Sequence, residues 1–259
     1  MLRRLALASI LLLLGCRTVT RQETGFLNRS LTLGTTTYPY IVYLPRDYER
    51  QRSWPVILFL HGAGERSTDG IRQTAIGVAN AIRFGPARVP AIVVFPQTPP
   101  ETRWIGEPAD AAIRALDEAI EEFRGDRDRV YLTGLSMGGY GTWHVALAHP
   151  DRFAAIVPVC GGILPSPAAI SVRQSPLTSS AADPYAFTAN ALKHLPIWIF
   201  HGAEDTVIPV TESRKMADAL RAVGADVRFT EYEGVGHNSW ERAYGDAELW
   251  TWMFAQRRR

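Results

Sequence analysis

A serine on a predicted sharp turn is the residue of this chain best placed to act as a nucleophile. The apolar residues 130–133 lead into Gly-Leu-Ser-Met-Gly at residues 134–138, and a helix-compatible stretch continues until Pro150. A strand that turns directly into a helix through Gly-x-Ser-x-Gly must bend at the serine and expose its hydroxyl above the sheet. The glycines remove Cβ atoms that would clash in the turn. We therefore expect Ser136 to be a nucleophile, although it could also simply cap the helix.

A glycine-rich loop near the C-terminus contains the histidine that fits best as the base for this serine. A serine hydroxyl needs a base to remove its proton, and the base needs an acid that fixes its tautomer. His237 lies in the loop at residues 234–240, directly after the last predicted strand, and completes the chain order serine, acid, histidine. The other five histidines are expected in structural or surface positions: His61, His144, His149, His194 and His201.

Two neighbouring carboxylates are candidates for the acid that orients His237. Glu204 and Asp205 both follow the predicted strand at residues 197–200, and catalytic groups in sheets of this kind collect beyond the carboxyl ends of the strands. Asp205 is preferred, because in comparable His-Gly-x-x-Asp loops this position turns back toward the histidine. Glu204 is the second choice, and both could instead be ordinary carboxylates at the start of a helix.

Backbone N–H groups beside the serine are predicted to stabilise a developing oxyanion. One donor is the N–H of Met137, the residue after the nucleophile. The second is expected from His-Gly-Ala-Gly-Glu at residues 61–65, where Ala63 or Gly64 would donate. Small residues there let the backbone approach a substrate closely. Together these residues predict nucleophilic attack on a carbonyl group.

Alternating strand-like and helix-like segments place these residues at one edge of a predicted sheet. Continuous apolar runs indicate strands that are buried on both faces, and helical spacing of apolar residues indicates helices that cover them. The sequence therefore predicts one α/β domain over residues 31–259, with a mostly parallel sheet of about eight strands and helices on both faces. The expected strands are residues 31–37, 38–44, 56–60, 91–95, 129–133, 153–159, 197–200 and 227–232, and the expected helices are residues 71–84, 109–123, 136–149, 212–223 and 240–256.

The segment at residues 163–195 interrupts the alternation of strands and helices. It is rich in Pro, Ser and Ala and contains no clear strand, so we expect either a partial cap over the site or an extended surface loop. Trp104 and Trp240 fall on the same side of the predicted sheet as the serine. Each could line a substrate groove or simply pack in the core.

Three motifs together resemble those of the α/β-hydrolase superfamily: residues 60–65, 134–141 and 236–240. The branch with the greatest likeness consists of secreted esterases described as predicted peptidases, akin to polyhydroxybutyrate depolymerases and feruloyl or acetyl-xylan esterases. The resemblance spans residues 38–259 and implies a carboxylesterase that cleaves short-chain, aryl or carbohydrate esters through an acyl-enzyme. The motifs do not specify a substrate. Residues 163–193 are longer than in that branch, which leaves the shape of the acyl pocket open.

Two other functions are compatible with the same motifs. A serine peptidase of the prolyl-oligopeptidase type shares this catalytic domain and would act on short peptides. A non-catalytic lipoprotein that uses the fold for surface binding would require an intact-looking triad and oxyanion loop to be idle. Comparing esters with matched amides separates the first alternative, and labelling with a fluorophosphonate separates the second.

Composition and charge exclude several classes of partner. The 259 residues are 46% hydrophobic and 21% charged, which fits one large globular α/β domain. The net charge of +2 is too small to indicate a nucleic-acid or polyanionic partner. No group of side chains has the spacing of metal ligands, and no glycine pattern suits a dinucleotide. The sequence therefore predicts a small-molecule ester as the partner and no cofactor or metal.

The first residues have the pattern of a signal peptide that ends at a cysteine. A basic start is followed by an apolar run at residues 5–14, which is too short to span a bilayer as a helix. Its end, Leu-Leu-Gly-Cys, resembles the bacterial lipobox. That resemblance implies a lipoprotein signal peptide at residues 1–15, acyl chains on Cys16 that anchor the protein to a membrane, and a polar tether at residues 16–30. The alternative is an ordinary secretory signal and a secreted protein.

The residues around the two cysteines refine this expectation. Arg17 stands where an aspartate would signal retention at the inner membrane, so the outer membrane of the bacterial cell envelope is favoured, on its periplasmic or surface side. Cys160 follows an apolar run and is expected to be a buried thiol. If Cys16 is acylated, no disulfide can form within the chain.

Overall fold

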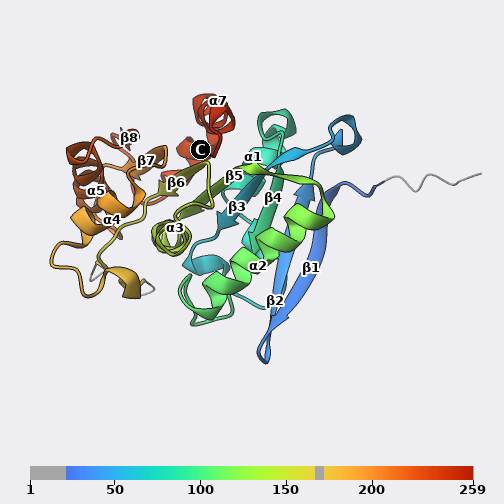
Figure 1. Cartoon of the computed structure of the whole chain (residues 1–259), viewed down its shortest axis with the longest axis horizontal. Coiled ribbons are helices and arrows are strands. Elements are labelled where there is room, and N and C mark those ends of the chain that lie inside the picture. The colour runs from blue at the N-terminus through green and yellow to red at the C-terminus, as the bar shows by residue number, and fades with distance from the viewer. Residues whose placement is uncertain (1–21, 167–171, 259) are drawn as a thin grey trace, which may run out of the picture.

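An eight-stranded sheet forms the centre of the fold, in the order β1-β2-β4-β3-β5-β6-β7-β8 (Figure 1). The structure is a computed structural model, and it describes residues 22–166 and 172–258. β2 is antiparallel to both of its neighbours, β1 and β4, and the other pairs are parallel. The strands are β1 (Gly25–Leu33), β2 (Thr36–Leu44), β3 (Trp54–Leu60), β4 (Ile92–Pro96), β5 (Gly125–Leu135), β6 (Ala155–Val159), β7 (Ile197–Gly202) and β8 (Val227–Tyr232).

Burial on both faces explains the composition of the central strands. Every residue of β3, β4 and β6 is buried. Along β3, Val56, Leu58 and Leu60 belong to one core and Ile57 and Phe59 to the other, as the two-residue period of a strand requires. A strand covered by helices on both sides therefore needs a continuous apolar run rather than an alternating one.

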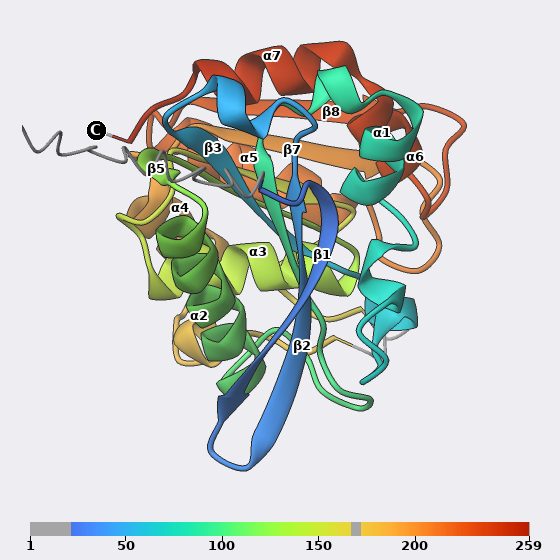
Figure 2. The same cartoon turned by 90° about the vertical axis from the view of Figure 1, so that its right-hand side faces the viewer.

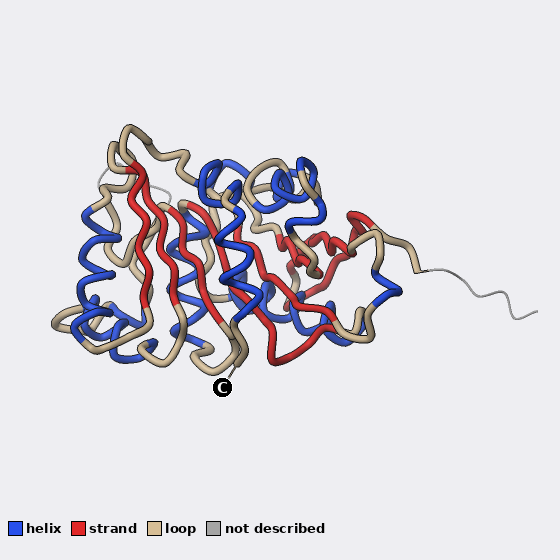
Figure 3. The backbone as a smooth tube through the Cα atoms, turned by 90° about the horizontal axis from the view of Figure 1, so that it is seen from above, coloured by secondary structure: helices blue, strands red, loops and turns tan. Residues whose placement is uncertain are grey.

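Helices cover both faces of the sheet, as Figures 2 and 3 show. Residues of α2, α3, α4 and α5 belong to the core of Leu58, and residues of α1, α6 and α7 to that of Phe59. This arrangement confirms the predicted α/β fold. Within the described ranges, no helix is both long and apolar enough to cross a membrane. The helices are α1 (Val78–Phe84), α2 (Glu107–Glu122), α3 (Met137–Ala148), α4 (Pro184–Leu192), α5 (Thr211–Ala222), α6 (Trp240–Gly245) and α7 (Ala247–Ala255).

Two of the predicted helices are interrupted in the structure. Residues 71–84 fold into a short 3₁₀ turn followed by α1, because Gly77 stands between them at φ +69°, a conformation that favours glycine. Residues 240–256 form α6 and α7, because Asp246 is extended and its carboxylate accepts a hydrogen bond from the N–H of Glu248 at the start of α7. The apolar spacing runs through both breaks and therefore does not reveal them.

The first strand begins earlier than the sequence predicts. β1 starts at Gly25, inside the range 16–30 predicted as a tether, so that boundary is wrong. β1 pairs with β2 along its whole length, and its side chains Leu27 and Leu31 are buried. This pairing and burial explain why residues 25–33 form a strand. The predicted signal peptide and Cys16 lie outside the described residues.

The described part of residues 163–195 contains a 3₁₀ turn at Pro176–Thr178 and helix α4. α4 lies against α3 and α5, and Tyr185 on α4 donates a hydrogen bond to Glu212 on α5 over 2.6 Å. α4 is therefore part of the helical layer on one face of the sheet. A cap over the site, as opposed to a surface loop, stays a prediction.

Candidate active site

Ser136 stands at the sharp turn between β5 and α3. Its backbone has φ +54° and ψ −117°, which is a strained conformation for a residue with a side chain. Gly134 and Gly138 make the turn possible, because a Cβ on Gly134 would overlap the carbonyl oxygen of Gly138, and one on Gly138 would overlap that of Leu60. The local sequence thus determines the predicted strand–turn–helix unit.

Ser136, His237 and Asp205 form a continuous line of hydrogen bonds. Ser136 Oγ lies 2.8 Å from His237 Nε2, and His237 Nδ1 lies 2.7 Å from Asp205 Oδ2. A carboxylate only accepts, so Nδ1–H donates to Asp205 and Nε2 is free to accept the serine proton. The structure therefore brings together the three residues predicted as nucleophile, base and acid, beyond the ends of β5, β8 and β7. Glu204, the second choice for the acid, is exposed.

The candidate acid is held by two histidines rather than one. The side chain of Asp205 is fully buried, and its Oδ2 lies 3.2 Å from His201 Nε2 as well as 2.7 Å from His237 Nδ1. Its Oδ1 accepts hydrogen bonds from the N–H groups of Val207 and Ile208. Burial alone would raise the pKa of Asp205, but the hydrogen bonds from His201 and His237 outweigh it and hold the pKa well below its usual value. Asp205 is therefore an ionised acceptor at neutral pH.

His201, which is expected from sequence to be structural, is a direct neighbour of the candidate acid. Its Nε2 lies 2.9 Å from the Ile208 oxygen and 3.2 Å from Asp205 Oδ2, so its N–H is shared between these two oxygens, and its Nδ1 accepts from Ser213 Oγ over 2.7 Å. These bonds fix the ring with Nε2 toward Asp205. The His-Gly-x-x-Asp spacing is the signal that could have identified this contact, since the loop after β7 folds back on itself within four residues.

The loop after β3 lies against the nucleophile turn. A Cβ built on Gly62 would lie 3.7 Å from the Cβ of Ser136. His61 is fully buried; its Nε2 accepts from the N–H of Thr98 over 3.1 Å, so the proton is on Nδ1, which donates to the Gly62 oxygen over 2.6 Å. The C=O and N–H of a trans peptide point in opposite directions, so this bond turns the N–H of Ala63 away from His61. His61 therefore sets the orientation of the peptide predicted to donate to an oxyanion.

The other two predicted oxyanion donors lie on the same side of the sheet. Met137 is the first residue of α3, where N–H groups have no partner within the helix and the helix dipole is positive. Gly64 lies in the 3₁₀ turn Ala63–Glu65 and is exposed. Burial lowers the pKa of His61 to about 4, so the residue that supports this loop is neutral at neutral pH.

The two tryptophans predicted to line a groove have different environments. Trp104 is only 2% exposed, and its Nε1–H donates to the His61 oxygen over 2.9 Å, so it packs against the loop after β3 and also lines a cavity. Trp240 is half-buried and stands edge-on to His237, with ring centroids 5.5 Å apart and planes at 90°. Trp240 therefore supports the ring of the candidate base.

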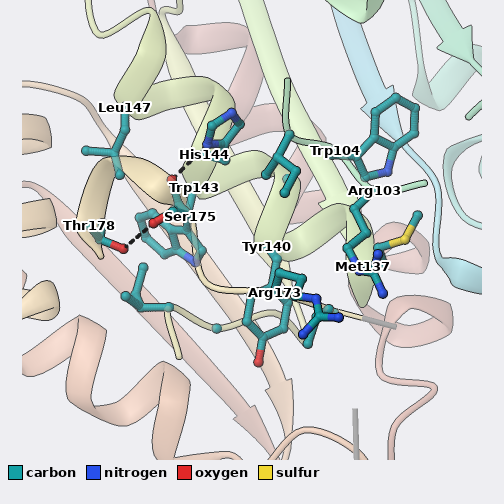
Figure 4. A pocket seen from close by; sticks show the side chains of 15 residues that line it. Arg103, Trp104, Met137, Tyr140, Trp143, His144, Leu147, Arg173, Ser175 and Thr178 are labelled. Atoms are coloured by element: carbon teal, nitrogen blue, oxygen red, sulfur yellow. Dashed lines mark hydrogen bonds between the residues drawn. The ribbon is translucent and has the colours of Figure 1, made fainter. Parts of the chain in front are cut away.

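A cavity extends along α3 from Met137, and Figure 4 shows the side chains around it. The sequence alone does not reveal this cavity, because its walls come from four separate stretches, at residues 103–105, 137–147, 162–163 and 172–178. At its far end, His144 Nδ1 lies 2.8 Å from Ser175 Oγ, which ties α3 to the start of the turn at Pro176–Thr178. In the part of the chain that the structure describes, no group of three or more His, Cys, Asp or Glu residues could hold a metal ion. Cys160 is buried, and burial raises the pKa of its thiol.

Comparisons with known proteins agree with this fold. Residues 105–251 match the model of the Phospholipase/Carboxylesterase family. The chain is 26% identical over 251 residues to feruloyl esterase B of Thermothelomyces thermophilus, which covers 85% of this chain and 82% of that protein. It is 27% identical over 213 residues to an uncharacterized secreted protein of Arthroderma benhamiae, and this match covers 73% of this chain and 22% of that protein.

A solved structure of a thermostable esterase has the same fold. It is 33% identical to this chain and superposes with a TM-score of 0.75, covering 90% of this chain and 63% of that one. The chain thus spans about a fifth of the Arthroderma relative and less than two thirds of the esterase. The expected relationship to serine esterases of the α/β-hydrolase superfamily is confirmed.

Proposed function

The chain belongs to the phospholipase/carboxylesterase family, and we propose that it hydrolyses carboxylic esters with Ser136 as the nucleophile. The observation that carries this proposal is the unbroken hydrogen-bonded line from Asp205 through His237 to Ser136. The strained turn supports it, because a residue with a side chain rarely adopts φ +54° together with ψ −117°, and strain of this kind clusters at active sites.

In the proposed reaction, His237 Nε2 takes the proton of Ser136 Oγ as the oxygen attacks the ester carbonyl. The ionised Asp205 keeps the other ring proton on Nδ1 and stabilises the imidazolium that forms. The tetrahedral intermediate then expels the alcohol, which receives the proton from His237 Nε2. Water, activated by the same nitrogen, cleaves the acyl-enzyme and restores the serine.

The negative charge that develops on the carbonyl oxygen would be stabilised by the N–H groups of Met137 and Ala63. The bond from His61 to the Gly62 oxygen favours Ala63 over Gly64, because it directs the Ala63 N–H away from the buried ring. Each such donor contributes about 3–4 kcal/mol to the stabilisation of a transition state. Met137 is the first residue of α3, and Ala63 is the first residue of the 3₁₀ turn Ala63–Glu65.

The proposed substrates are short-chain, aryl or carbohydrate-linked esters. Similarity to feruloyl esterase B supports an aryl ester.

The test is hydrolysis of a short para-nitrophenyl ester by the Ser136→Ala variant. We expect turnover to disappear, together with labelling by a fluorophosphonate, while the far-UV spectrum is retained. Ser53→Ala is the matched control, because Ser53 is exposed and directly precedes β3, at the amino ends of the parallel strands and therefore opposite the site. Activity of Ser136→Ala equal to that of the control would overturn the proposal. Faster cleavage of amides than of matched esters would assign the site to a peptidase instead.

We also propose that the protein is a lipoprotein of the bacterial cell envelope, with Cys16 as its acylated first residue. This proposal rests on the basic start, the apolar run and the cysteine that follows it. Mass spectrometry of the mature protein tests it. A mature chain that begins elsewhere, or an unmodified Cys16, would contradict the anchor.

A further inference from the structure

The chain enters the fold at the edge of the sheet that lies opposite the candidate active site. β1 and β4 are both antiparallel to β2, so β1 begins at the amino ends of the parallel strands, whereas Ser136 lies beyond their carboxyl ends. Gln22, the first described residue, is six positions after Cys16, the residue proposed above to be acylated. A peptide chain extends by at most about 3.6 Å per residue, so these six positions span at most about 22 Å. An acyl anchor on Cys16 would therefore hold the start of β1 close to the membrane.

An exposed apolar segment connects α1 to β4 at this same edge. Phe84, the last residue of α1, is 85% exposed. The residues that follow it include the exposed Pro86, Ala87 and Pro90, so most of the exposed side chains between residues 84 and 90 are apolar. A phenylalanine this exposed contributes little to the core, and contiguous apolar surface marks a place where a protein binds something else.

This apolar segment lies directly beside the start of β1. The guanidinium carbon of Arg83, the residue before Phe84, lies 5.1 Å from the centroid of the Phe26 ring, and Phe26 is the second residue of β1. Phe26 pairs in turn with Tyr43 on β2, with ring centroids 5.0 Å apart. Tyr43 and residues of the segment 86–90 line one surface groove. The exposed apolar residues and the point where the chain enters the fold therefore belong to one continuous surface.

Arginines outnumber acidic residues on this surface. Arg46 lines the groove and Arg88 lies within the apolar segment; both are exposed, and neither forms an ion pair with another residue that the structure describes. Asp47 is the one acidic residue among the described residues that line the groove. In the sequence, residues 17–24 add two arginines and one glutamate. An anionic membrane attracts each basic residue that lies near its surface, so the charge of this surface suits such a membrane.

We propose that this surface, formed by Phe84, Pro86, Ala87, Arg46 and Arg88 and named the Phe84 surface, docks onto the anionic membrane that holds the acyl anchor. The proposal rests on the lipid anchor proposed above. Phe84 would insert its ring among the lipid headgroups, and the two arginines would donate hydrogen bonds to headgroup phosphates. The acyl chains supply the attachment, and the Phe84 surface fixes the orientation. The candidate active site lies at the opposite edge of the sheet, so it would face away from the membrane and receive its ester from the aqueous phase.

A polarity-sensitive fluorescent probe tests whether the Phe84 surface touches the membrane. The anchored protein is reconstituted into vesicles of phosphatidylethanolamine and phosphatidylglycerol, with the probe on Ala87→Cys and Phe84 left intact. Cys160 is fully buried and an acylated Cys16 has no free thiol, so only position 87 is labelled. Quenching of the probe by nitroxides attached to the lipid headgroups reports contact with the membrane.

The same probe at the other edge of the sheet is the control for position. Ile71→Cys carries it, because Ile71 is 68% exposed and apolar like the residues of the Phe84 surface. The N–H of the preceding Gly70 donates to the side chain of Gln97, directly after β4, so Ile71 lies at the carboxyl edge. We expect quenching and a shift of emission to shorter wavelength at position 87, and neither at position 71.

Two substitutions test the apolar contact and a change of lipid tests the charge. Phe84→Ser should lower the ratio of docked to undocked protein, read from the fluorescence lifetimes of the probe at position 87, about tenfold, because the inserted ring favours the docked state. Phe187→Ser is the matched control, because Phe187 is an exposed phenylalanine on α4, which lies against α3 and α5. It should leave the ratio unchanged. Vesicles with phosphatidylcholine in place of phosphatidylglycerol should lower the ratio about fivefold for each arginine that touches the membrane.

Failure of this inference differs from failure of the anchor and of the proposed reaction. Mass spectrometry of Cys16 tests the anchor, and an unmodified cysteine would overturn the anchor and the docking together. With Cys16 acylated, an unquenched probe at position 87, or equal quenching at positions 87 and 71, would overturn the docking alone. An equal fall in Phe84→Ser and Phe187→Ser would do the same. A shift of the emission that depends on protein concentration in detergent without lipid would also overturn it, because the Phe84 surface would then bind a second copy of this chain.

Discussion

Replacing His61 by glutamine should keep the two hydrogen bonds of this residue and remove its uptake of a proton. His61 is fully buried, donates from Nδ1 to the Gly62 oxygen and accepts at Nε2 from the N–H of Thr98. The side-chain amide of glutamine has one donor and one acceptor that can satisfy the same two groups, but it takes up no proton near neutral pH. The variant should therefore keep the loop after β3 in place.

The size of the effect follows from the burial of the ring. Burial lowers the pKa of His61 from 6.5 to about 4. Between these two values the unfolded chain binds a proton at this position and the folded protein does not, so stability falls as the pH falls through this window. From pH 7 to pH 5 the loss from this one residue is about 2 kcal/mol, and it approaches about 3 kcal/mol near pH 4.

Urea unfolding of the wild type and of His61→Gln at pH 7 and at pH 5 measures the loss of stability that the titration of His61 causes. We expect the wild type to lose about 2 kcal/mol more than the variant between the two pH values. Between pH 8 and pH 7, where little titration of this group occurs in either state, the two proteins should lose the same amount. Equal losses between pH 7 and pH 5 would refute the reasoning, because His61 would then accept a proton inside the fold.

Other substitutions test the turn at Ser136, the acid Asp205 and the hydrogen bonds that Glu212 on α5 accepts. Gly138→Ala should destabilise the protein by about 3 kcal/mol in urea unfolding, because its Cβ would overlap the Leu60 oxygen, whereas Gly245→Ala faces open space and should be within about 1 kcal/mol of the wild type. Asp205→Asn should lower kcat for a para-nitrophenyl ester about 10⁴-fold with the circular dichroism unchanged, since an amide favours the wrong tautomer of His237; a loss below tenfold would exclude this acid. Glu212→Ala should lower the free energy of unfolding by about 2 kcal/mol, because it leaves the N–H groups of Ile163 and Leu164 and the hydroxyl of Tyr185 without their acceptor; unchanged stability would show that these bonds contribute little.

Local features of the chain were predictable because they depend on neighbours in sequence. The turn at Ser136 follows from two glycines within two residues of it, and the buried strands follow from continuous apolar runs. The meeting of Ser136, Asp205 and His237 was also predictable, since parallel strands bring their carboxyl ends to one edge of a sheet. These inferences need only the order of the elements.

Features that depend on how distant segments pack were not predictable. The contact of His201 with Asp205 requires the loop after β7 to fold back, and the bond from His61 to the Gly62 oxygen requires a specific peptide orientation. The start of β1 at Gly25 depends on its pairing with β2, because the polar residues 28–30 interrupt the apolar residues of its own sequence. The cavity needs α3 and the segment around Val172 to be side by side.

The position of β8 at the edge of the sheet has a consequence for how much denaturant the proposed activity tolerates. None of the residues Val227–Tyr232 is fully buried, and His237 follows this strand, whereas Ser136 follows a strand in the middle of the sheet. Edge elements with few buried contacts open at a lower free energy than the centre. Such local openings separate the base from the nucleophile while the core stays intact. In rising denaturant we therefore expect the proposed hydrolysis to stop before the protein unfolds, as parallel measurements of activity and of circular dichroism would show.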